Sequence, residues 1–311
     1  MDPVVSVIIA TYNHRPFIEK ALDSVLTQEV NFSYEVLIGD DCSTDGTAEL
    51  LQRYASLPNV RLFCRSENMG ASYNLNDLQG RAAGKYIAYL DGDDYWQDPH
   101  KLQKQVDFLE QNPSFIACTS LSLIIDQSDK PLKKQRVSWI PRKKSFSLKD
   151  FKGIYLPGQI GTLLHRSFAS QGLDPSVELL HPTIADRALF LLLLSKGRVY
   201  QMPSKLCTYR ISTEMNSATD SLYRKNCNYV ADDYEYTLLL QDYSESHHIP
   251  CSFSTHKRHL FVSAFYMRIK CKNAESKMIL HKISHDGCPL KYWLYLPFGI
   301  LQKFYQRTMA A

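Results

Sequence analysis

Short apolar runs alternate with amphipathic segments along the first third of the chain. Short runs rich in valine, isoleucine and leucine predict buried strands, and apolar residues spaced three or four apart predict helices. The alternation is typical of a mainly parallel sheet covered by helices. We expect strands at residues 4–10, 34–39, 60–64 and 86–90. Helices are expected at about residues 15–28 and at residues 71–78. Two more are expected to begin at a cap near Ser43 or Thr44 and at Pro99.

The pattern is less regular further along the chain. Further strands are expected at residues 115–125 and near 160–165, and a buried helix is expected at about 184–194. Residues 130–149 are basic, contain proline and lack periodicity, which indicates a surface loop. The residues after about 217 have a mostly helical pattern. We therefore predict an α/β domain over residues 1–216 and a mostly helical extension over 217–311.

Composition narrows the class of protein. With 311 residues and 44% hydrophobic content, the chain can bury a sizeable core. Its formal charge of +4 is too small to indicate a nucleic-acid partner. The eight cysteines include no C-x-x-C pair, and the start of the chain lacks the basic region of a secretory signal. These features predict a cytoplasmic protein with reduced thiols.

Polar residues follow three of the first four expected strands, at Thr11-Tyr12-Asn13, at residues 40–46 and at residues 91–94. Ligands of open α/β sheets bind beyond the carboxyl ends of the strands. In Asp91-Gly92-Asp93, one carboxylate can reach a ribose hydroxyl or a water while the other holds a hard divalent cation. Such cations are commonly held by one or two carboxylates together with substrate phosphates. The sequence therefore predicts a diphosphate ligand with magnesium or manganese.

Acidic residues after strands also form turns and cap helices. We favour this structural role for Asp45, Asp94 and Asp98. For the Asp40-Asp41 and Asp91-x-Asp93 pairs we favour a functional role over a structural one, because crowded like charges are costly without a cation. Rival phosphate motifs are missing, since no G-x-G-x-x-G follows the first strand, and residues 80–85 are one residue short of a P-loop.

Four separated motifs together resemble family 2 glycosyltransferases of the GT-A fold. They run from Ser6 to Asn13, from Asp40 to Gly46, from Asn68 to Gly70 and from Gly84 to Asp94, and the resemblance covers residues 4–215. It implies a mainly parallel sheet with helices on both faces. It also implies inverting transfer of a sugar from a nucleotide-diphosphate donor, with UDP favoured, to a saccharide or lipid-linked saccharide. The expected setting is cell-surface polysaccharide synthesis.

The resemblance also implies roles for individual residues. Asp41 corresponds to the carboxylate that reads the base, Asp93 to the ligand of Mn²⁺ or Mg²⁺, and Asp186 to the general base. Tyr209-Arg210 corresponds to a pair near the diphosphate. The implied donor-binding residues are Thr11, Tyr12, Asn13, Asp40, Asp41, Asn68, Asp91 and Arg210.

Two positions depart from the family pattern. Cys42 replaces a glycine or small polar residue, and Ser212 stands where many members have a histidine, so we expect Arg210 to carry more of the phosphate contact. Asp186 also suits a helix N-cap, although we favour the base, and the two roles are compatible. If Asp186 is not the base, Glu178 or Asp174 is the alternative.

Two other functions fit part of the pattern. A sugar nucleotidyltransferase normally has a glycine-rich basic loop after the first strand, but residues 11–16 contain no glycine. A sugar-binding subunit without catalysis would not need Asp93 and Asp186.

The segment 289–307 mixes aromatic and basic residues and is interrupted at Pro297 and Gly299. It is too short and broken to span a membrane. It fits either an interfacial segment, which would place the protein peripherally at the inner face of the cell membrane, or a helix packed on the protein.

Overall fold

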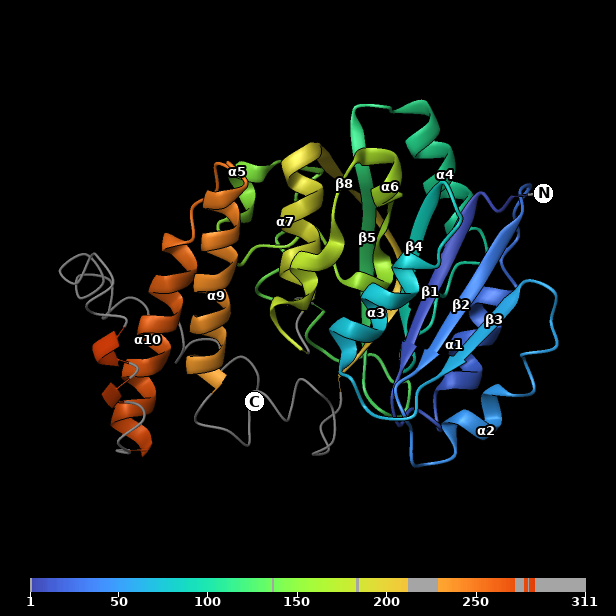
Figure 1. The fold of residues 1–311 in the computed structure, drawn as a ribbon, viewed down its shortest axis with the longest axis horizontal. Helices are drawn as coiled ribbons and strands as arrows, with labels where there is room; N and C mark the ends of the chain where they lie inside the picture. The colour runs from blue at the N-terminus through green and yellow to red at the C-terminus, as the bar shows by residue number, and fades with distance from the viewer. Residues whose placement is uncertain are drawn as a thin grey trace. The chain divides into compact units, whose positions relative to one another are not determined.

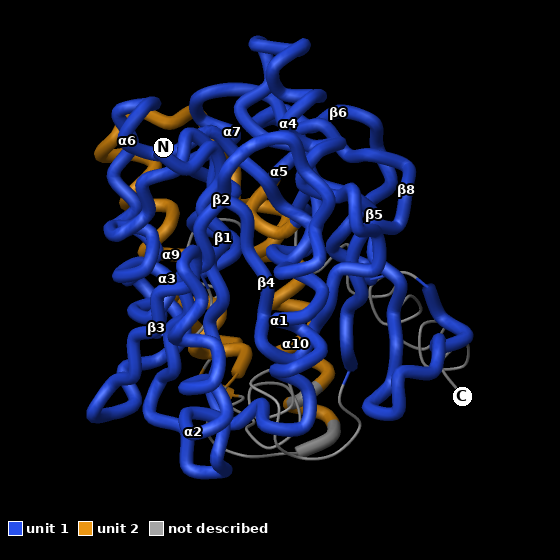
Figure 2. Tube along the Cα trace, turned by 90° about the vertical axis from the view of Figure 1, so that its right-hand side faces the viewer, with its two compact units in different colours: residues 1–151, 155–211 blue, residues 152–154, 212–311 orange. Residues whose placement is uncertain are grey.

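The computed structural model describes residues 2–135, 137–182, 185–211, 229–271, 277–278 and 280–282. The chain divides into two compact units, one of residues 1–151 and 155–211 and the other of residues 152–154 and 212–311 (Figure 2). The predicted division after residue 216 lies outside the described residues.

Within its described residues, the first unit contains an eight-stranded sheet in the order β3-β2-β1-β4-β7-β5-β8-β6 (Figure 1). β7 pairs antiparallel with both β4 and β5, and β6 pairs antiparallel with β8, whereas the other pairs are parallel. The carboxyl ends of six strands therefore meet at one edge of the sheet. The strands are β1 (Val5–Thr11), β2 (Tyr34–Asp40), β3 (Val60–Cys64), β4 (Tyr86–Asp91), β5 (Phe115–Ile125), β6 (Ser145–Phe146), β7 (Leu164–Arg166) and β8 (Arg198–Arg210).

Helices cover both faces of this sheet. Alternate side chains of β1, namely Val5, Val7 and Ile9, pack in one core with residues of α1, α2 and α4. α3 and α7 lie against the other face (Figure 1). Residues 188–194 of α7 are all apolar and all buried, so this part of the helix is covered on every side. The helices are α1 (Ile18–Leu26), α2 (Thr47–Leu51), α3 (Ala71–Gly80), α4 (Lys101–Gln111), α5 (Leu148–Phe151), α6 (Phe168–Gln171) and α7 (Asp186–Lys196), with 3₁₀ turns η1 (Ile160–Thr162) and η2 (Pro175–Leu180).

Two of the predicted helices begin later than expected. The helix expected from Ser43 or Thr44 begins at Thr47, because the Asp45 carboxylate accepts hydrogen bonds from the Thr47 N–H and hydroxyl. The helix expected from Pro99 begins at Lys101, because Asp98 accepts the His100 N–H. Asp45 and Asp98 thus have the turn-forming role that the sequence favoured.

Two further predictions need correction. The helix expected at 15–28 is shorter at both ends, and the strand expected at 160–165 is instead η1 followed by β7. At η1 the Gly161 carbonyl accepts the Trp96 indole N–H, and a Cβ on Gly161 would lie 3.0 Å from the Cys207 sulfur. This close packing across the sheet explains the compact turn.

The described part of the second unit contains α9 (Tyr229–Ser246) and α10 (Ser254–Cys271). Val230 and Tyr234 of α9 pack with Leu260, Phe261 and Ala264 of α10 in a small core. None of the helices in the described ranges has both the length and the apolar content needed to cross a membrane. Residues 289–307 lie outside these ranges.

Candidate active site

The loops after β1 and β2 are joined by hydrogen bonds at the carboxyl edge of the sheet. The Asp41 N–H donates to the Thr11 carbonyl at 3.0 Å. Asn13 has a φ of 56°, and its side-chain oxygen accepts the Thr44 N–H at 2.8 Å while its own N–H donates to the Ser43 hydroxyl at 2.8 Å. The structure therefore brings together the donor-binding residues predicted on these loops.

The adjacent Asp40 and Asp41 contact different parts of the chain. Asp40 accepts the Ser43 N–H and hydroxyl at 3.0 and 2.5 Å and so shapes the turn after β2. The two carboxylate oxygens of Asp41 accept the N–H groups of Met69 and Gly70, each at 2.9 Å. Asp41 thereby fastens the predicted Asn68 motif to the end of β2, and each of its oxygens keeps a second lone pair.

The turn after β4 packs closely against the loop after β1. A Cβ on Gly92 would lie 2.6 Å from the Thr11 hydroxyl and 2.7 Å from Nδ1 of His14, so a larger residue would push these loops apart. Asp94 is buried and accepts the Arg210 backbone N–H at 2.6 Å. This structural role agrees with the expectation for Asp94.

The guanidinium of Arg210, to which the resemblance gave a phosphate contact, is engaged by groups of the protein itself. It donates to the Asp93 carbonyl at 2.7 Å, to the Asp126 carbonyl at 2.9 Å and to the Asp129 carboxylate at 2.6 Å. It also lies 4.3 Å from the centre of the Phe17 ring. Enclosed by these groups, Arg210 holds the backbone of the Asp93 turn.

Asp91, Asp93 and Asp186 differ from the acidic residues above. Within the described residues, no group of another residue donates a hydrogen bond to any of these three carboxylates. Burial, followed by the nearby charges of Asp93 and Asp186, raises the pKa of Asp91 well above its ordinary value. The pKa of the half-buried Tyr209 is raised too, first by desolvation and then by the charge of Asp94 and those of all three carboxylates. The structure therefore gathers three predicted site carboxylates into one negatively charged cluster.

This cluster fits a hard divalent cation that arrives with a diphosphate. Crowded carboxylates without hydrogen-bond donors are stabilised by a cation. In the part of the chain that the structure describes, no group of three or more His, Cys, Asp or Glu side chains could hold a metal ion by itself. Mg²⁺ and Mn²⁺ do not require such a cage, because phosphates and waters complete their coordination.

Asp186 is the first residue of α7, and no side chain caps that helix. The N-cap interpretation is therefore wrong, because the N-cap position belongs to Ala185. Burial raises the pKa of Asp186 to about 6. Of the alternative bases, Glu178 is fully buried and accepts the Gln79 amide at 2.7 Å, and Asp174 accepts the Ser176 N–H and hydroxyl.

Sequence reasoning missed a link between the two sides of the site. Gly70 has a φ of +90°, and a Cβ there would lie 2.7 Å from the Pro182 carbonyl oxygen. The same carbonyl accepts the Ser72 N–H at 3.0 Å. Pro182, four residues before Asp186 in the sequence, is thus fastened to the start of α3, which Asp41 fastens to β2. The glycine of the Asn68-Met69-Gly70 motif was the available signal.

Comparisons with known proteins give a family match over more than half of the chain. Residues 6–170 match the family described as "Glycosyl transferase family 2". TuaG of Bacillus subtilis (strain 168), which carries the name of a teichuronic acid biosynthesis glycosyltransferase, is 35% identical over 211 residues that cover 67% of this chain and 79% of TuaG.

Solved structures share the fold at low sequence identity. TarS 1–349 of S. aureus in complex with UDP-GlcNAc has a TM-score of 0.63 at 16% identity, covering 90% of this chain and 79% of that one. The mannosyltransferase PcManGT of Pyrobaculum calidifontis in complex with GDP-Man and Mn²⁺ has a TM-score of 0.52 at 17% identity, covering 100% and 83%. These likenesses confirm the predicted α/β GT-A fold. Because the family match covers more than half of the chain, and TuaG aligns over most of its own length, the chain belongs to glycosyl transferase family 2 and is a glycosyltransferase.

Proposed function

We propose that this glycosyltransferase moves a sugar, with inversion, from a nucleotide-diphosphate donor to a saccharide or lipid-linked saccharide acceptor. The observation that carries the proposal is the cluster of Asp91, Asp93 and Asp186 at the carboxyl edge of the sheet. UDP is the favoured nucleotide, with support from TarS in complex with UDP-GlcNAc. PcManGT in complex with GDP-Man shows that the same fold also accepts a guanosine nucleotide, so both bases belong in the test.

The donor would lie along the loops that follow β1, β2 and β4. We assign Thr11, Tyr12 and Asn13 to the nucleotide, together with Asp41 and Asn68 on the joined loops. Asp40 contributes by shaping its own turn. Asp91 would contact the ribose, and Asp93 would hold Mn²⁺ or Mg²⁺. When bound, the cation would neutralise the charge of the diphosphate leaving group.

Asp186 would act as the general base. Its carboxylate takes the proton from the acceptor hydroxyl, the hydroxyl oxygen forms a bond to the anomeric carbon, and the bond to the diphosphate breaks. A pKa of about 6 leaves Asp186 mostly ionised at pH 7 and still basic enough to receive the proton. Attack from the face opposite the leaving group inverts the anomeric centre.

We place the catalytic domain in residues 1–216 and a helical extension in residues 217–311. The name of TuaG supports a role in cell-surface polysaccharide synthesis. The aromatic and basic composition of residues 289–307 supports a peripheral position at the inner face of the cell membrane.

Thermal denaturation of the full chain with a panel of UDP- and GDP-sugars, with and without Mn²⁺, tests the proposal. A donor that binds the folded state raises the midpoint temperature. We expect at least one UDP-sugar to do so only with Mn²⁺, and to release nucleoside diphosphate when an acceptor is added. If no nucleotide sugar shifts the midpoint under either condition, the proposed donor site is wrong.

A further inference from the structure

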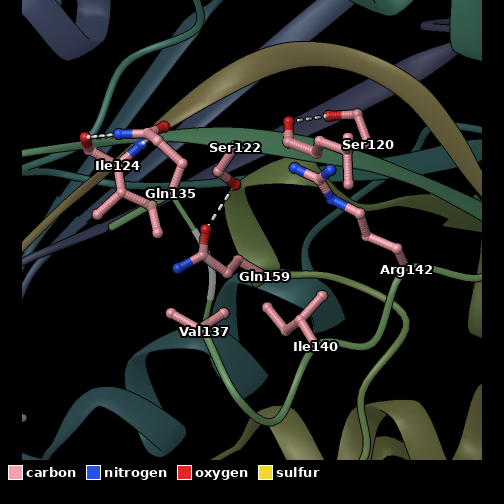
Figure 3. Close-up of a pocket in the computed structure, with 9 residues that line it drawn as sticks. Ser120, Ser122, Ile124, Gln135, Val137, Ile140, Arg142 and Gln159 are labelled. Carbon is pink, nitrogen blue, oxygen red and sulfur yellow. Dashed lines mark hydrogen bonds between the residues drawn. The ribbon is translucent and has the colours of Figure 1, made fainter. Parts of the chain in front are cut away.

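A pocket on β5 lies outside the site described above (Figure 3). One wall comes from β5, another from the predicted basic loop, and Gln159 completes it. Figure 3 shows Arg142 reaching from the loop toward the strand. The lining residues are Ser120, Leu121, Ser122, Ile124, Gln135, Val137, Ile140, Arg142 and Gln159.

The pocket is close to the proposed reaction centre along one strand. Ile125, the last residue of β5, pairs with Arg210, whose guanidinium holds the Asp93 carbonyl. Because a strand rises about 3.3 Å per residue, Ser122 lies about 10 Å from that end of β5. A ligand that extends from the reaction centre along β5 could therefore reach the pocket.

Most polar groups of the pocket wall already have protein partners. The Gln135 amide donates to the carbonyls of Ile124 and Leu132, and its oxygen accepts the Ile124 N–H and the Lys205 ammonium. The Ser122 hydroxyl donates to the Gln159 side-chain oxygen at 2.5 Å. These bonds fix the wall and leave few of its polar groups free.

The free hydrogen-bonding groups of the pocket are mainly donors. Within the described ranges, the Arg142 guanidinium has no ion pair or hydrogen bond to another residue, and the Gln159 amide nitrogen donates to no group. No acidic residue lines the pocket. Residues 130–149, which include Arg142, contain eight Lys and Arg residues and no Asp or Glu. An oxyanion has a charge opposite to that of Arg142, and its oxygens can accept hydrogen bonds from both Arg142 and Gln159.

We propose that this pocket binds an oxyanion of the acceptor, a sugar carboxylate or a phosphate, through Arg142 and Gln159. The proposal rests on the proposed function, because it treats the ligand as the acceptor of a sugar transfer. Leu121, Val137 and Ile140 supply apolar surface against which the face of a sugar ring can pack. The site thus selects acidic acceptors over neutral ones.

Binding of sodium glucuronate, inorganic phosphate and glucose to the full chain, measured by ligand-observed NMR, tests the proposal. We expect glucuronate or phosphate to bind and glucose not to bind, and the difference between the two anions identifies the carboxylate or phosphate source. Arg142→Gln should weaken the anion about tenfold to 100-fold, as expected for loss of a charge-assisted hydrogen bond. Lys134→Gln, on the same loop but outside the pocket lining, removes the same charge and should leave the affinity unchanged.

Two results would overturn this assignment: neither anion binds, or both variants weaken the anion equally. Thermal shift with nucleotide sugars in the same samples tests the donor site separately. If an anion binds but no nucleotide sugar shifts the midpoint temperature, the proposed function is refuted and the oxyanion site stands. If a nucleotide sugar shifts the midpoint temperature but no anion binds, the proposed function stands and the oxyanion site is refuted.

Discussion

Hydrogen-bond partners separate the acidic residues of this site into two groups. Asp40, Asp41 and Asp94 accept bonds from backbone N–H groups, so their oxygens hold loops in place. Asp91 and Asp93 accept no hydrogen bond from another residue within the described ranges. A carboxylate that holds no part of its own protein is available to a ligand, and crowding it beside other carboxylates without a cation is costly.

Asp93→Asn should remove most of the metal-dependent donor binding. The amide keeps the shape of the side chain but lacks the negative charge that a hard cation needs. We expect affinity for a UDP-sugar with Mn²⁺, measured by calorimetry, to fall at least about tenfold, since even residues behind a metal ligand contribute that much. Asp23→Asn, on an exposed position of α1, is the charge-matched control. Equal affinities in the two variants would refute the role of Asp93.

Asp186→Asn should separate catalysis from donor binding. Asparagine cannot accept the acceptor proton, so single-turnover transfer should fall about 10²–10⁴-fold while donor affinity remains. In the unchanged protein, transfer should decline as the pH falls through about 6, because the base becomes protonated. The variant should lose this dependence. Near-normal transfer by the variant would mean that another group is the base.

The same substitution should not destabilise the fold at neutral pH. Burial raises the folded-state pKa of Asp186 from 3.8 to about 6, so the folded state binds the proton more tightly than the unfolded state. This contribution to stability is present below about pH 4 and is lost as the pH rises through 6. At pH 7, Asn should therefore unfold at the same temperature or a higher one, which thermal denaturation would show.

At the scale of elements, the strands β1 to β4 and the α/β class could be predicted from the alternation of apolar runs and amphipathic segments. Because parallel strands end at the same edge of a sheet, the α/β class also predicts that the candidate residues after these strands lie at its carboxyl edge. The hydrogen-bond partner of each acidic residue there could not be predicted, because the partners are distant in sequence. The amides that Asp41 binds lie 28 and 29 residues along, and Arg210 reaches across 117 residues to the Asp93 carbonyl. Only the packed sheet brings such groups together.

The start of α3 is fastened both to Asp41, at the end of β2, and to Pro182, and Gly70, the residue before the helix, tests that connection. Gly70→Ala would place a methyl group 2.7 Å from the Pro182 oxygen at a φ of +90°. We expect it to lower the free energy of unfolding by about 1–3 kcal/mol and to lower turnover by displacing Pro182, four residues before Asp186 in the sequence. Urea unfolding and single-turnover transfer measure the two effects.

Gly80→Ala is the matched control, because Gly80 ends the same helix and a Cβ there meets nothing within 4 Å. It should leave turnover unchanged and keep or raise stability, by up to about 1 kcal/mol. If Gly70→Ala behaves like Gly80→Ala in both measurements, α3 does not position Asp186.

For the whole molecule, the net charge of +4 conceals an uneven distribution. Residues 130–149 and 289–307 together contain eleven Lys and Arg residues and no Asp or Glu, so the rest of the chain has more acidic than basic residues. The first segment borders the Arg142 pocket. The second combines Lys291, Lys303 and Arg307 with aromatic residues, which is typical of segments that lie at an anionic lipid surface.

Replacing Lys291, Lys303 and Arg307 by Gln in the full chain should abolish flotation with anionic vesicles. Each basic residue near such a surface contributes about 1 kcal/mol, so three should weaken binding about 100-fold, and high salt should weaken the unchanged chain similarly. A control with Lys130, Lys133 and Lys134 replaced by Gln has the same net charge. If it loses flotation equally, general charge attracts the protein to the vesicle. If neither variant loses flotation, electrostatic attraction through residues 289–307 is ruled out, and a helix packed on the protein becomes the better interpretation of this segment.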